Sequence, residues 1–265
     1  MSKPVRVIKS REQAEAILSR FGQPGPETGV SYATVRDYCE SRDELPQITP
    51  IDGDLKNVQR PWTTKAILAH LRPPARLLEI GGGEPIVSGL LSELGYNVTL
   101  VDPYDGFGNG PIDYERYVEQ FPHVRIVREY LRPGLPGLVP GSFDGIFSIS
   151  VLEHVPSDAL RSCFEAITEF LAPNGLSIHC FDFILQGAGD AHDLIQAQKI
   201  LAEQNRLGGD HDATSFEGLL EQLRNDVETF FLAPQGHHNW RGGRAYPDFP
   251  FRKVVSLQSI VRRAA

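Results

Sequence analysis

Apolar and polar residues alternate along the middle of this chain in blocks typical of strands and helices that follow one another. Short runs rich in Leu, Ile and Val have the length and composition of buried strands. We predict strands at residues 76–80, 97–101, 124–128, 143–148 and 175–182. We predict helices between and after them, near residues 85–94, 111–120 and 157–171. Such alternation predicts a parallel sheet with right-handed crossovers and helices on both faces.

The flanking segments carry further helical and extended patterns. Ser10 to Phe21 has an amphipathic pattern, with Ser10 placed to cap the helix. Further helices are expected near residues 32–42, 63–71, 191–207 and 215–223, and further strands at 227–232 and 251–262. Residues 22–61 are rich in proline, glycine and charge, which predicts an irregular arm. We therefore divide the chain into an N-terminal helical arm, residues 1–65, and a core, residues 66–265.

Composition limits the class of protein. With 265 residues, 41% of them hydrophobic, the chain has enough apolar side chains for one α/β core and an extension. The net charge of −8 provides no general attraction for phosphate backbones, so nucleic acid is not expected as a partner. No apolar run approaches the ~20 residues that span a bilayer, and no signal pattern opens the sequence, so no membrane partner is expected. Cys39, Cys163 and Cys180 lack C-x-x-C spacing, which indicates reduced thiols in a cytoplasmic protein.

A dense run of glycine follows the first predicted strand of the core. The strand at 76–80 leads into Gly81, Gly82 and Gly83, and the next strand ends at Asp102. Glycine lets the backbone approach a ligand without a Cβ in the way. A carboxylate at the end of the second strand is placed to accept both hydroxyls of a ribose. This strand–glycine turn–helix–strand–acid layout predicts a nucleoside site at the carboxyl edge of a parallel sheet.

The details of the glycine turn separate classes of nucleotide-binding protein. The third glycine of the dinucleotide pattern G-x-G-x-x-G is absent, and no G-x-x-x-x-G-K-[ST] phosphate loop occurs. Instead, Glu79-Ile-Gly-Gly-Gly83 resembles motif I of the class I S-adenosylmethionine-dependent methyltransferases, and Asp102 matches that family's ribose-binding acid. Residues 143–155 resemble the family's fourth strand and the loop after it, and residues 171–182 resemble its turn into strand five.

The resemblance implies a fold, a cofactor and a set of cofactor contacts. It implies a Rossmann-like, seven-stranded, mostly parallel sheet, whose antiparallel last strand forms a hairpin with the sixth strand at 227–232. It implies S-adenosyl-L-methionine as cofactor. The residues at the matching positions are Glu79, Gly81, Gly82, Gly83, Asp102, Pro103, Glu129, Tyr130, Ser150 and Val151. Glu129 and Tyr130 stand where the family contacts adenine, although ordinary surface positions explain them equally well. Glu84 departs from the pattern, because it places a negative charge where the methionine carboxylate approaches the helix N-terminus.

Methyl transfer from a sulfonium is an in-line displacement whose thioether leaving group needs no acid, so the protein chiefly aligns a nucleophile and excludes water. Candidate catalytic residues are His154, Asp182, His237 and His238. His154 is either a general base or a structural histidine. Asp182 forms a base or metal site with Asp190, His192 and Asp193, or belongs to a solvated polar loop. Since no compact ligand spacing appears, we expect no metal.

Two segments carry candidate substrate contacts. The stretch 235–244, expected as the loop of the last hairpin, holds Trp240, Arg241 and Arg244, which suit an anionic or aromatic substrate. A surface hairpin with a locally packed tryptophan explains the stretch equally well. Tyr32 and Trp62 lie in the N-terminal arm, where they form a lid or take a plain packing role.

The sequence therefore predicts a cytoplasmic S-adenosylmethionine-dependent methyltransferase acting on oxygen or nitrogen of a small molecule, such as a sugar or secondary metabolite. The string Asp102-Pro-Tyr104 is not the D-P-P-Y signature of nucleic-acid enzymes, since it follows the second strand rather than the fourth. Two other classes stay open: a nucleotide-binding oxidoreductase with the same sheet, and a non-catalytic cofactor-binding relative. The acceptor and the oligomeric state are not predicted.

Overall fold

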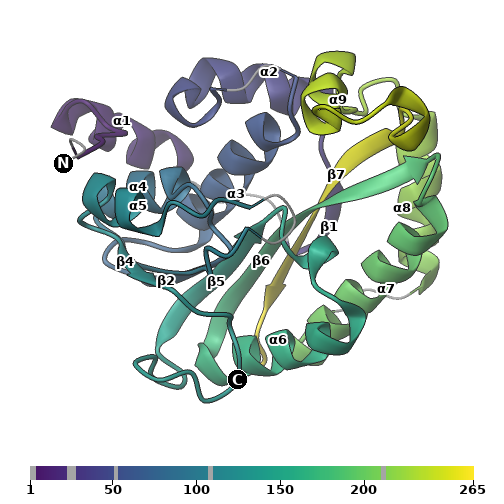
Figure 1. Cartoon of the computed structure of the whole chain (residues 1–265). Coiled ribbons are helices and arrows are strands. Elements are labelled where there is room, and N and C mark those ends of the chain that lie inside the picture. The colour runs from purple at the N-terminus through teal and green to yellow at the C-terminus, as the bar shows by residue number, and fades with distance from the viewer. Residues whose placement is uncertain (1–3, 23–27, 51–52, 107–109, 210–212) are drawn as a thin grey trace.

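The computed structural model describes residues 4–22, 28–50, 53–106, 110–209 and 213–265. A twisted seven-stranded sheet lies between two layers of helices (Figure 1). The strands are β1 (Gly29–Tyr32), β2 (Arg76–Ile80), β3 (Asn97–Val101), β4 (Arg125–Val127), β5 (Phe143–Ile149), β6 (Leu171–Gln186) and β7 (Lys253–Arg262). The helices are α1 (Arg11–Phe21), α2 (Val35–Glu44), α3 (Lys56–His70), α4 (Ile86–Glu93), α5 (Tyr114–Gln120), α6 (Ser157–Phe170), α7 (Asp190–Leu207), α8 (Ala213–Asn225) and α9 (Pro234–Arg241).

The order of the strands determines where a ligand is bound. Across the sheet the order is β1-β7-β6-β5-β2-β3-β4. Strands β2 to β6 pair in parallel, and β7 runs antiparallel to both of its neighbours. Strand β2 pairs with β3 on one side and β5 on the other, so successive crossovers leave it in opposite directions. In open α/β sheets, ligands bind at such a reversal, beyond the carboxyl ends of the strands.

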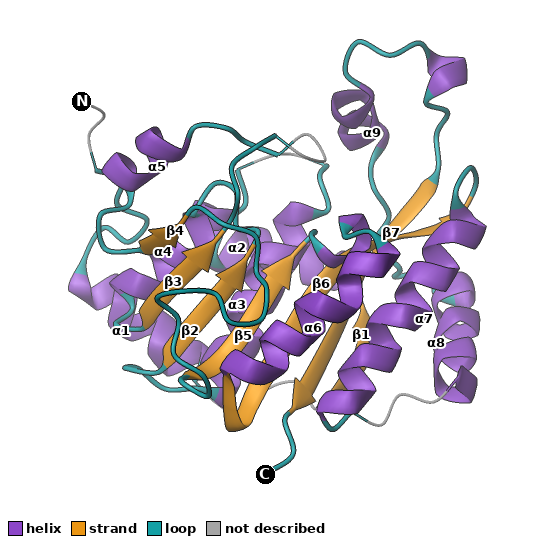
Figure 2. Cartoon of the chain, turned by 60° about the horizontal axis from the view of Figure 1, so that its bottom comes forward, coloured by secondary structure: helices purple, strands orange, loops and turns teal. Residues whose placement is uncertain are grey.

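Each face of the sheet has its own apolar core. Helices α1, α3 and α4 cover one face and α6, α7 and α8 the other (Figure 2). Helix α6 shows why: Leu160, Cys163, Phe164 and Ile167 recur at helical spacing, and all four are buried. The predicted seven-stranded, mostly parallel sheet with an antiparallel last strand and helices on both faces is confirmed. Within the described part of the chain, no helix combines the length and apolar character needed to cross a bilayer.

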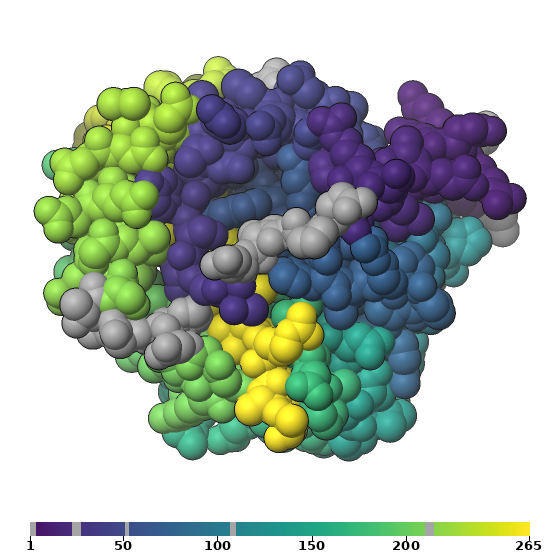
Figure 3. Space-filling view, turned by 180° about the vertical axis from the view of Figure 1, so that it is seen from behind, coloured from purple at the N-terminus to yellow at the C-terminus, as the bar shows by residue number. Residues whose placement is uncertain are grey.

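The prediction of a sixth strand at 227–232 is wrong. In this segment only Thr229 and Phe231 make isolated bridges, and Val227 is 93% exposed. The free edge of β7 is occupied instead by β1, whose residues pair with Leu257–Ile260. Figure 3 shows the consequence, with the purple N-terminal part and the yellow last strand meeting on one face of the molecule. The N-terminal part of the chain therefore supplies a strand of the core sheet.

The segment 235–244 is not the loop of a hairpin, because most of it forms α9. Pro234 begins the helix, where its missing N–H needs no partner, and Gly242, with φ 56°, follows its last residue. Helix α9 and the chain leading to β7 project beyond the end of the sheet (Figure 2). In the N-terminal arm, α2 confirms the helix expected near 32–42, although it starts three residues later because β1 ends at Tyr32, and α3 starts seven residues earlier than predicted. Residues 1–3, 23–27 and 51–52 of that arm lie outside the described residues, and the division of the chain at residue 65 stays a prediction.

Candidate functional site

A cavity of about 710 Å³ lies beyond the carboxyl ends of the parallel strands. Its wall combines the glycine turn after β2, the residues that follow β3, β4 and β5, and the start of α3. All ten residues expected to contact the cofactor lie in this wall: Glu79, Gly81, Gly82, Gly83, Asp102, Pro103, Glu129, Tyr130, Ser150 and Val151. The spacing of motifs along the sequence therefore predicted which segments meet at one site.

The glycine turn has a conformation that other residues do not tolerate. Gly81 and Gly83 have φ of 63° and 53°, in the left-handed region that favours glycine. A Cβ on Gly81 would lie 2.7 Å from a methyl group of Val151, and a Cβ on Gly82 would lie 2.4 Å from the Leu100 side chain. The turn therefore brings bare backbone to the cavity.

Asp102 is held in place by the backbone around it. Its Oδ2 accepts a hydrogen bond from the Gly83 N–H at 3.0 Å, and its Oδ1 accepts one from the Tyr104 N–H at 2.8 Å. The Tyr104 hydroxyl in turn donates to the Gly83 carbonyl at 2.9 Å. Each carboxylate oxygen keeps a second lone-pair direction, so the fixed carboxylate is able to accept two further hydrogen bonds from the cavity.

Glu79 is almost fully buried at the end of β2, with 3% exposure. The Ser88 hydroxyl of α4 donates a short hydrogen bond to its Oε2. Burial raises the pKa of Glu79 to about 7, and this effect outweighs the opposing influence of Ser88 and of the Arg60 charge. Glu79 therefore ties β2 to α4 and adds an acid of unusually high pKa to the wall.

The remaining predicted cofactor residues differ in exposure. Ser150 and Val151 are half-buried, whereas Glu129 and Tyr130 are exposed at the rim. The Tyr130 hydroxyl donates a short hydrogen bond to Asp105. Contact of Glu129 or Tyr130 with an adenine ring stays a prediction.

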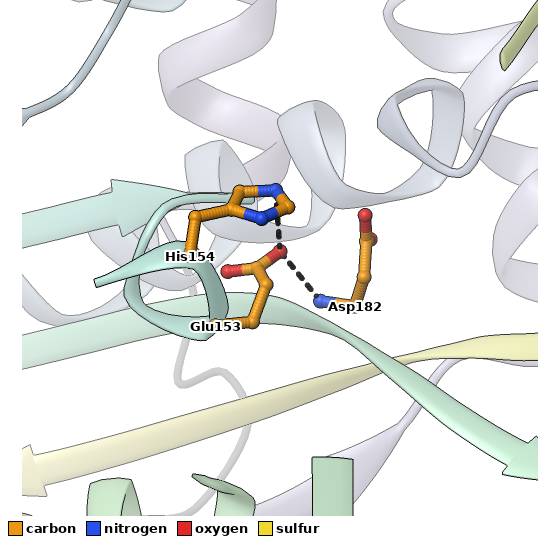
Figure 4. Close-up of side chains that lie close together, drawn as sticks. All are labelled: Glu153, His154 and Asp182. Carbon is orange, nitrogen blue, oxygen red and sulfur yellow. Dashed lines mark hydrogen bonds and ion pairs between the residues drawn. The ribbon is translucent and has the colours of Figure 1, made fainter. Parts of the chain in front are cut away.

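The loop after β5 and the middle of β6 bring three ionisable side chains together (Figure 4). Glu153 Oε1 accepts a hydrogen bond from the Asp182 N–H at 2.9 Å and lies 4.0 Å from His154 Nε2. Asp182 accepts from the Ser150 hydroxyl at 3.0 Å and from Gln59 Nε2 at 2.7 Å. Burial raises the pKa of Glu153 well above its ordinary value and raises that of Asp182. His154 is half-exposed and lines the cavity.

Asp190, His192 and Asp193, which the sequence suggested as possible partners of Asp182, do not lie beside it. Asp190 and Asp193, in the first turn of α7, accept hydrogen bonds from the backbone N–H groups of Gly187 and Ile184. His192 is exposed beside Asp193. The alternative of a base or metal site formed by Asp182 with these three residues is therefore not supported, because Gly187 and Gly189 turn the chain away from β6 into α7.

The residues of α9 do not belong to the described cavity wall. His237 is buried and stacks on Phe249, with ring centroids 5.4 Å apart, and His238 is exposed. Arg241 donates to the carbonyl oxygen of Arg244 at 2.6 Å. The Arg244 guanidinium lies 3.8 Å from the Phe249 ring. Catalytic roles for the two histidines and substrate contacts by the two arginines stay predictions.

Three aromatic side chains expected near the substrate pack against the protein. Trp240 and Trp62 contact the apolar cluster beside β7, and Trp240 Nε1 donates to Asp54 at 3.0 Å. The Tyr32 hydroxyl donates to Asp226 at 2.7 Å. Only Asp54 among these partners lines the cavity, so α9 reaches the site through Asp54. Direct substrate contact by Tyr32, Trp62 and Trp240 stays a prediction.

Sequence reasoning missed the contribution of α3. Lys56 and Arg60 of α3 line the cavity together with Asp54, which lies just before the helix, and Arg60 is 8% exposed. Arg60 Nη2 lies 3.7 Å from Glu84, and its Nη1 is buried with no hydrogen-bond partner among the described residues. Arg60 thus balances the negative charge that Glu84 places beside the glycine turn. The start of α3 was missed because residues 22–61 are rich in proline and glycine, which predicts an irregular segment rather than a helix.

Comparison with known proteins identifies the family. A model of a methyltransferase domain matches residues 55–223, more than half of the chain. The chain is 30% identical over 132 residues to two uncharacterized proteins, from two strains of Mycobacterium tuberculosis. These matches cover 43% of this chain and 41% of each relative, so the chain spans well under half the length of the curated relatives it matches.

Two solved methyltransferase structures are similar to this chain. Geranyl diphosphate C-methyltransferase from Streptomyces coelicolor superposes with a TM-score of 0.50 and 12% identity, over 97% of this chain and 100% of that chain. A TehB-like S-adenosylmethionine-dependent methyltransferase from Corynebacterium glutamicum has a TM-score of 0.42 and 22% identity, over 63% of this chain and 82% of that chain. The likeness to the first structure supports the fold, and the matching domain model identifies the family. The chain therefore belongs to the methyltransferase domain family, which confirms the resemblance of its motifs to class I S-adenosylmethionine-dependent methyltransferases.

Proposed function

We propose that this protein is an S-adenosylmethionine-dependent methyltransferase that acts on oxygen or nitrogen of a small molecule. The observation that carries the proposal is the fixed Asp102 carboxylate, which faces a cavity beside the bare Gly81–Gly83 turn. A Cβ on Gly81 would lie 2.7 Å from Val151 and one on Gly82 would lie 2.8 Å from Glu79, both in the wall, which supports a turn that only glycine can form. The family assignment supports methyl transfer as the chemistry.

The residues present fit the cofactor at both of its ends. Asp102 is placed to accept hydrogen bonds from two ribose hydroxyls. Arg60, buried with Nη1 lacking a partner, is placed to bind the methionine carboxylate. Glu84 would repel the methionine carboxylate, and the positive charge of Arg60 beside Glu84 offsets that repulsion. When bound, the cofactor supplies a methyl group on a positively charged sulfur, which an acceptor attacks in line.

The protein's part in the reaction is to position the acceptor and to exclude water. Ser150, held at φ 57° and hydrogen-bonded to Asp182, shapes the wall after β5. His154, half-exposed in the same wall, faces the acceptor space, where it would either take a proton from an acceptor hydroxyl or ammonium group directly or hold a cation that makes the acceptor more acidic. Asp182 acts through Ser150, and we assign it a positioning role.

The size and charge of the site support a small acceptor. A volume of about 710 Å³ falls within the ~300–1,000 Å³ typical of small-molecule sites. The net charge of −8 disfavours nucleic acid. The free thiols of Cys39, Cys163 and Cys180 support a cytoplasmic location, and a sugar or secondary metabolite is the acceptor class that we propose.

Calorimetry with S-adenosylmethionine and S-adenosylhomocysteine tests the proposal directly, and NAD serves as the competing ligand. We expect saturable binding of one cofactor per chain and no response to NAD. Transfer of a labelled methyl group to a panel of hydroxyl and amine acceptors then tests turnover. Binding of NAD alone would favour an oxidoreductase, and cofactor binding with only slow cofactor hydrolysis would favour a non-catalytic relative.

A further inference from the structure

We propose that Glu153, His154 and Asp182 form a binding site for one divalent metal cation beside the cavity, whose wall His154 lines. Each residue offers one candidate ligand atom, and these atoms lie within 4.8 Å of one another. Figure 4 shows the His154 ring directly above the Glu153 carboxylate, with Asp182 beside it on the neighbouring strand. Metal–ligand bonds of ~2.0–2.2 Å require these three atoms to move closer together when a cation binds.

The donor set selects a class of ion. Two carboxylates and one imidazole suit Mn²⁺, Fe²⁺ or Zn²⁺, and three protein ligands leave further coordination positions free. His154 reaches the site from the cavity, and its side chain is 52% exposed, so the remaining positions face the acceptor space. Hard oxygen ligands also permit Mg²⁺, whose geometry is more demanding.

The buried carboxylate of Glu153 has fewer partners within the described residues than its charge requires. Its side chain is only 8% exposed; its Oε1, the oxygen that faces His154 and Asp182, accepts one hydrogen bond, and its Oε2, on the far side of the carboxylate, is buried without a hydrogen-bond donor among the described residues. The ion pairs of the described chain give Glu153 only His154, at 4.0 Å. A buried carboxylate oxygen without a partner is costly, so its presence here indicates a missing cation or proton.

The surrounding hydrogen bonds orient the ligands as second-layer contacts do in known metal sites. Gln59 and Ser150 each donate to one oxygen of Asp182, and the Asp182 N–H donates to Glu153 Oε1. A carboxylate oxygen that accepts one hydrogen bond keeps a second lone pair for a metal. The hydrogen bonds therefore fix the Asp182 and Glu153 carboxylates and leave a lone pair on each oxygen for a cation.

Titration of the chelator-treated protein with MnCl₂ tests the proposal, with calorimetry and the loss of the free Mn²⁺ resonance as two readouts. We expect one Mn²⁺ per chain, and at least tenfold weaker binding in Glu153→Gln and in His154→Gln. His192→Gln is the matched control, because His192 also lies beside an acid but at the exposed start of α7. It should bind Mn²⁺ like the parent protein.

Circular dichroism and melting temperature establish that each variant is folded, and half-exposed His154 is the substitution least able to disturb the core. Absence of stoichiometric Mn²⁺ binding by the parent protein would overturn the proposal and leave a proton shared between Glu153 and Asp182. Equal binding by His154→Gln and His192→Gln would overturn it as well, since the cation would then sit elsewhere. Neither readout depends on methyl transfer, so a failed activity assay leaves this test intact.

Discussion

Replacing Asp102 by alanine tests the cofactor site at its best-defined contact. In the parent protein the carboxylate is fixed by the Gly83 and Tyr104 N–H groups and is 8% exposed. Alanine removes both acceptors offered to a ribose, and it also leaves the two N–H groups without their partner. The variant should therefore bind S-adenosylmethionine more weakly and have a less rigid turn.

The size of the loss follows from the two hydrogen bonds to a charged acceptor. Each is worth ~1.5–3 kcal/mol, and water entering the space left by the side chain recovers part of the sum. A net loss of about 2–4 kcal/mol corresponds to a dissociation constant raised roughly 30-fold to 1,000-fold. At least a tenfold change is required, because a smaller one would mean that the carboxylate does not receive both hydroxyls.

Isothermal titration with S-adenosylhomocysteine measures this change, alongside a melting curve that shows the variant is folded. Asp43→Ala is the control, since Asp43 is an exposed acid on α2 and its loss changes the net charge equally. A folded Asp102→Ala protein that binds less than tenfold more weakly than the parent would refute the contact of the carboxylate with both ribose hydroxyls. If Asp43→Ala weakened cofactor binding equally, the loss in Asp102→Ala would be explained by the change in net charge alone.

Three further predictions concern the same cavity. Burial raises the pKa of Glu79 from 4.5 to about 7, so as the pH rises the unfolded chain loses this proton before the folded chain does. The free energy of unfolding should therefore decrease by up to roughly 3 kcal/mol as the pH rises from 4.5 to 7. Glu79→Gln should flatten that part of the curve of unfolding free energy against pH. Arg60→Ala should weaken S-adenosylmethionine about tenfold in calorimetry and leave adenosine unchanged, whereas equal losses would indicate a structural role. EDTA should lower labelled methyl transfer to a hydroxyl acceptor at least tenfold, and Mn²⁺ should restore it; unchanged turnover would show that transfer needs no cation.

Local signals were sufficient for the part of the site built from β2 and β3. Each strand is a short apolar run, and each leads directly to the residues that matter, Gly81–Gly83 and Asp102. Parallel strands end at the same edge, so two such runs predict a common site without knowledge of anything distant. This explains six of the ten expected cofactor residues in the cavity wall, and the other four, which follow β4 and β5, were expected only from the resemblance to the family.

Competition between distant segments explains the failures. Residues 227–232 contain valine, two phenylalanines and leucine, which favour a strand. Gly29–Tyr32 takes the edge of β7 with a four-residue register from Gly29↔Ile260 to Tyr32↔Leu257, so residues 227–232 reach that edge only beyond it, through the isolated bridge of Phe231 to Val255. Sequence patterns measure the tendency to extend and not the outcome of such a competition. Arg60 was missed for a related reason, since only the folded α3 brings it to Glu84.

The grouping around Asp182 shows the same principle at the level of single side chains. Asp190 and His192 are close to Asp182 along the chain, yet its partners are Ser150 and Glu153, about thirty positions away. Strand β5 pairs with β6 through Ile149↔Cys180, so the residues just beyond that pair lie on adjacent strands ~4.8 Å apart. A slip of one residue in this register would turn Asp182 to the other face of the sheet and separate it from Glu153. The proposed cation site therefore depends on strand register, and the pairing of β5 with β6 is what makes the two acids neighbours.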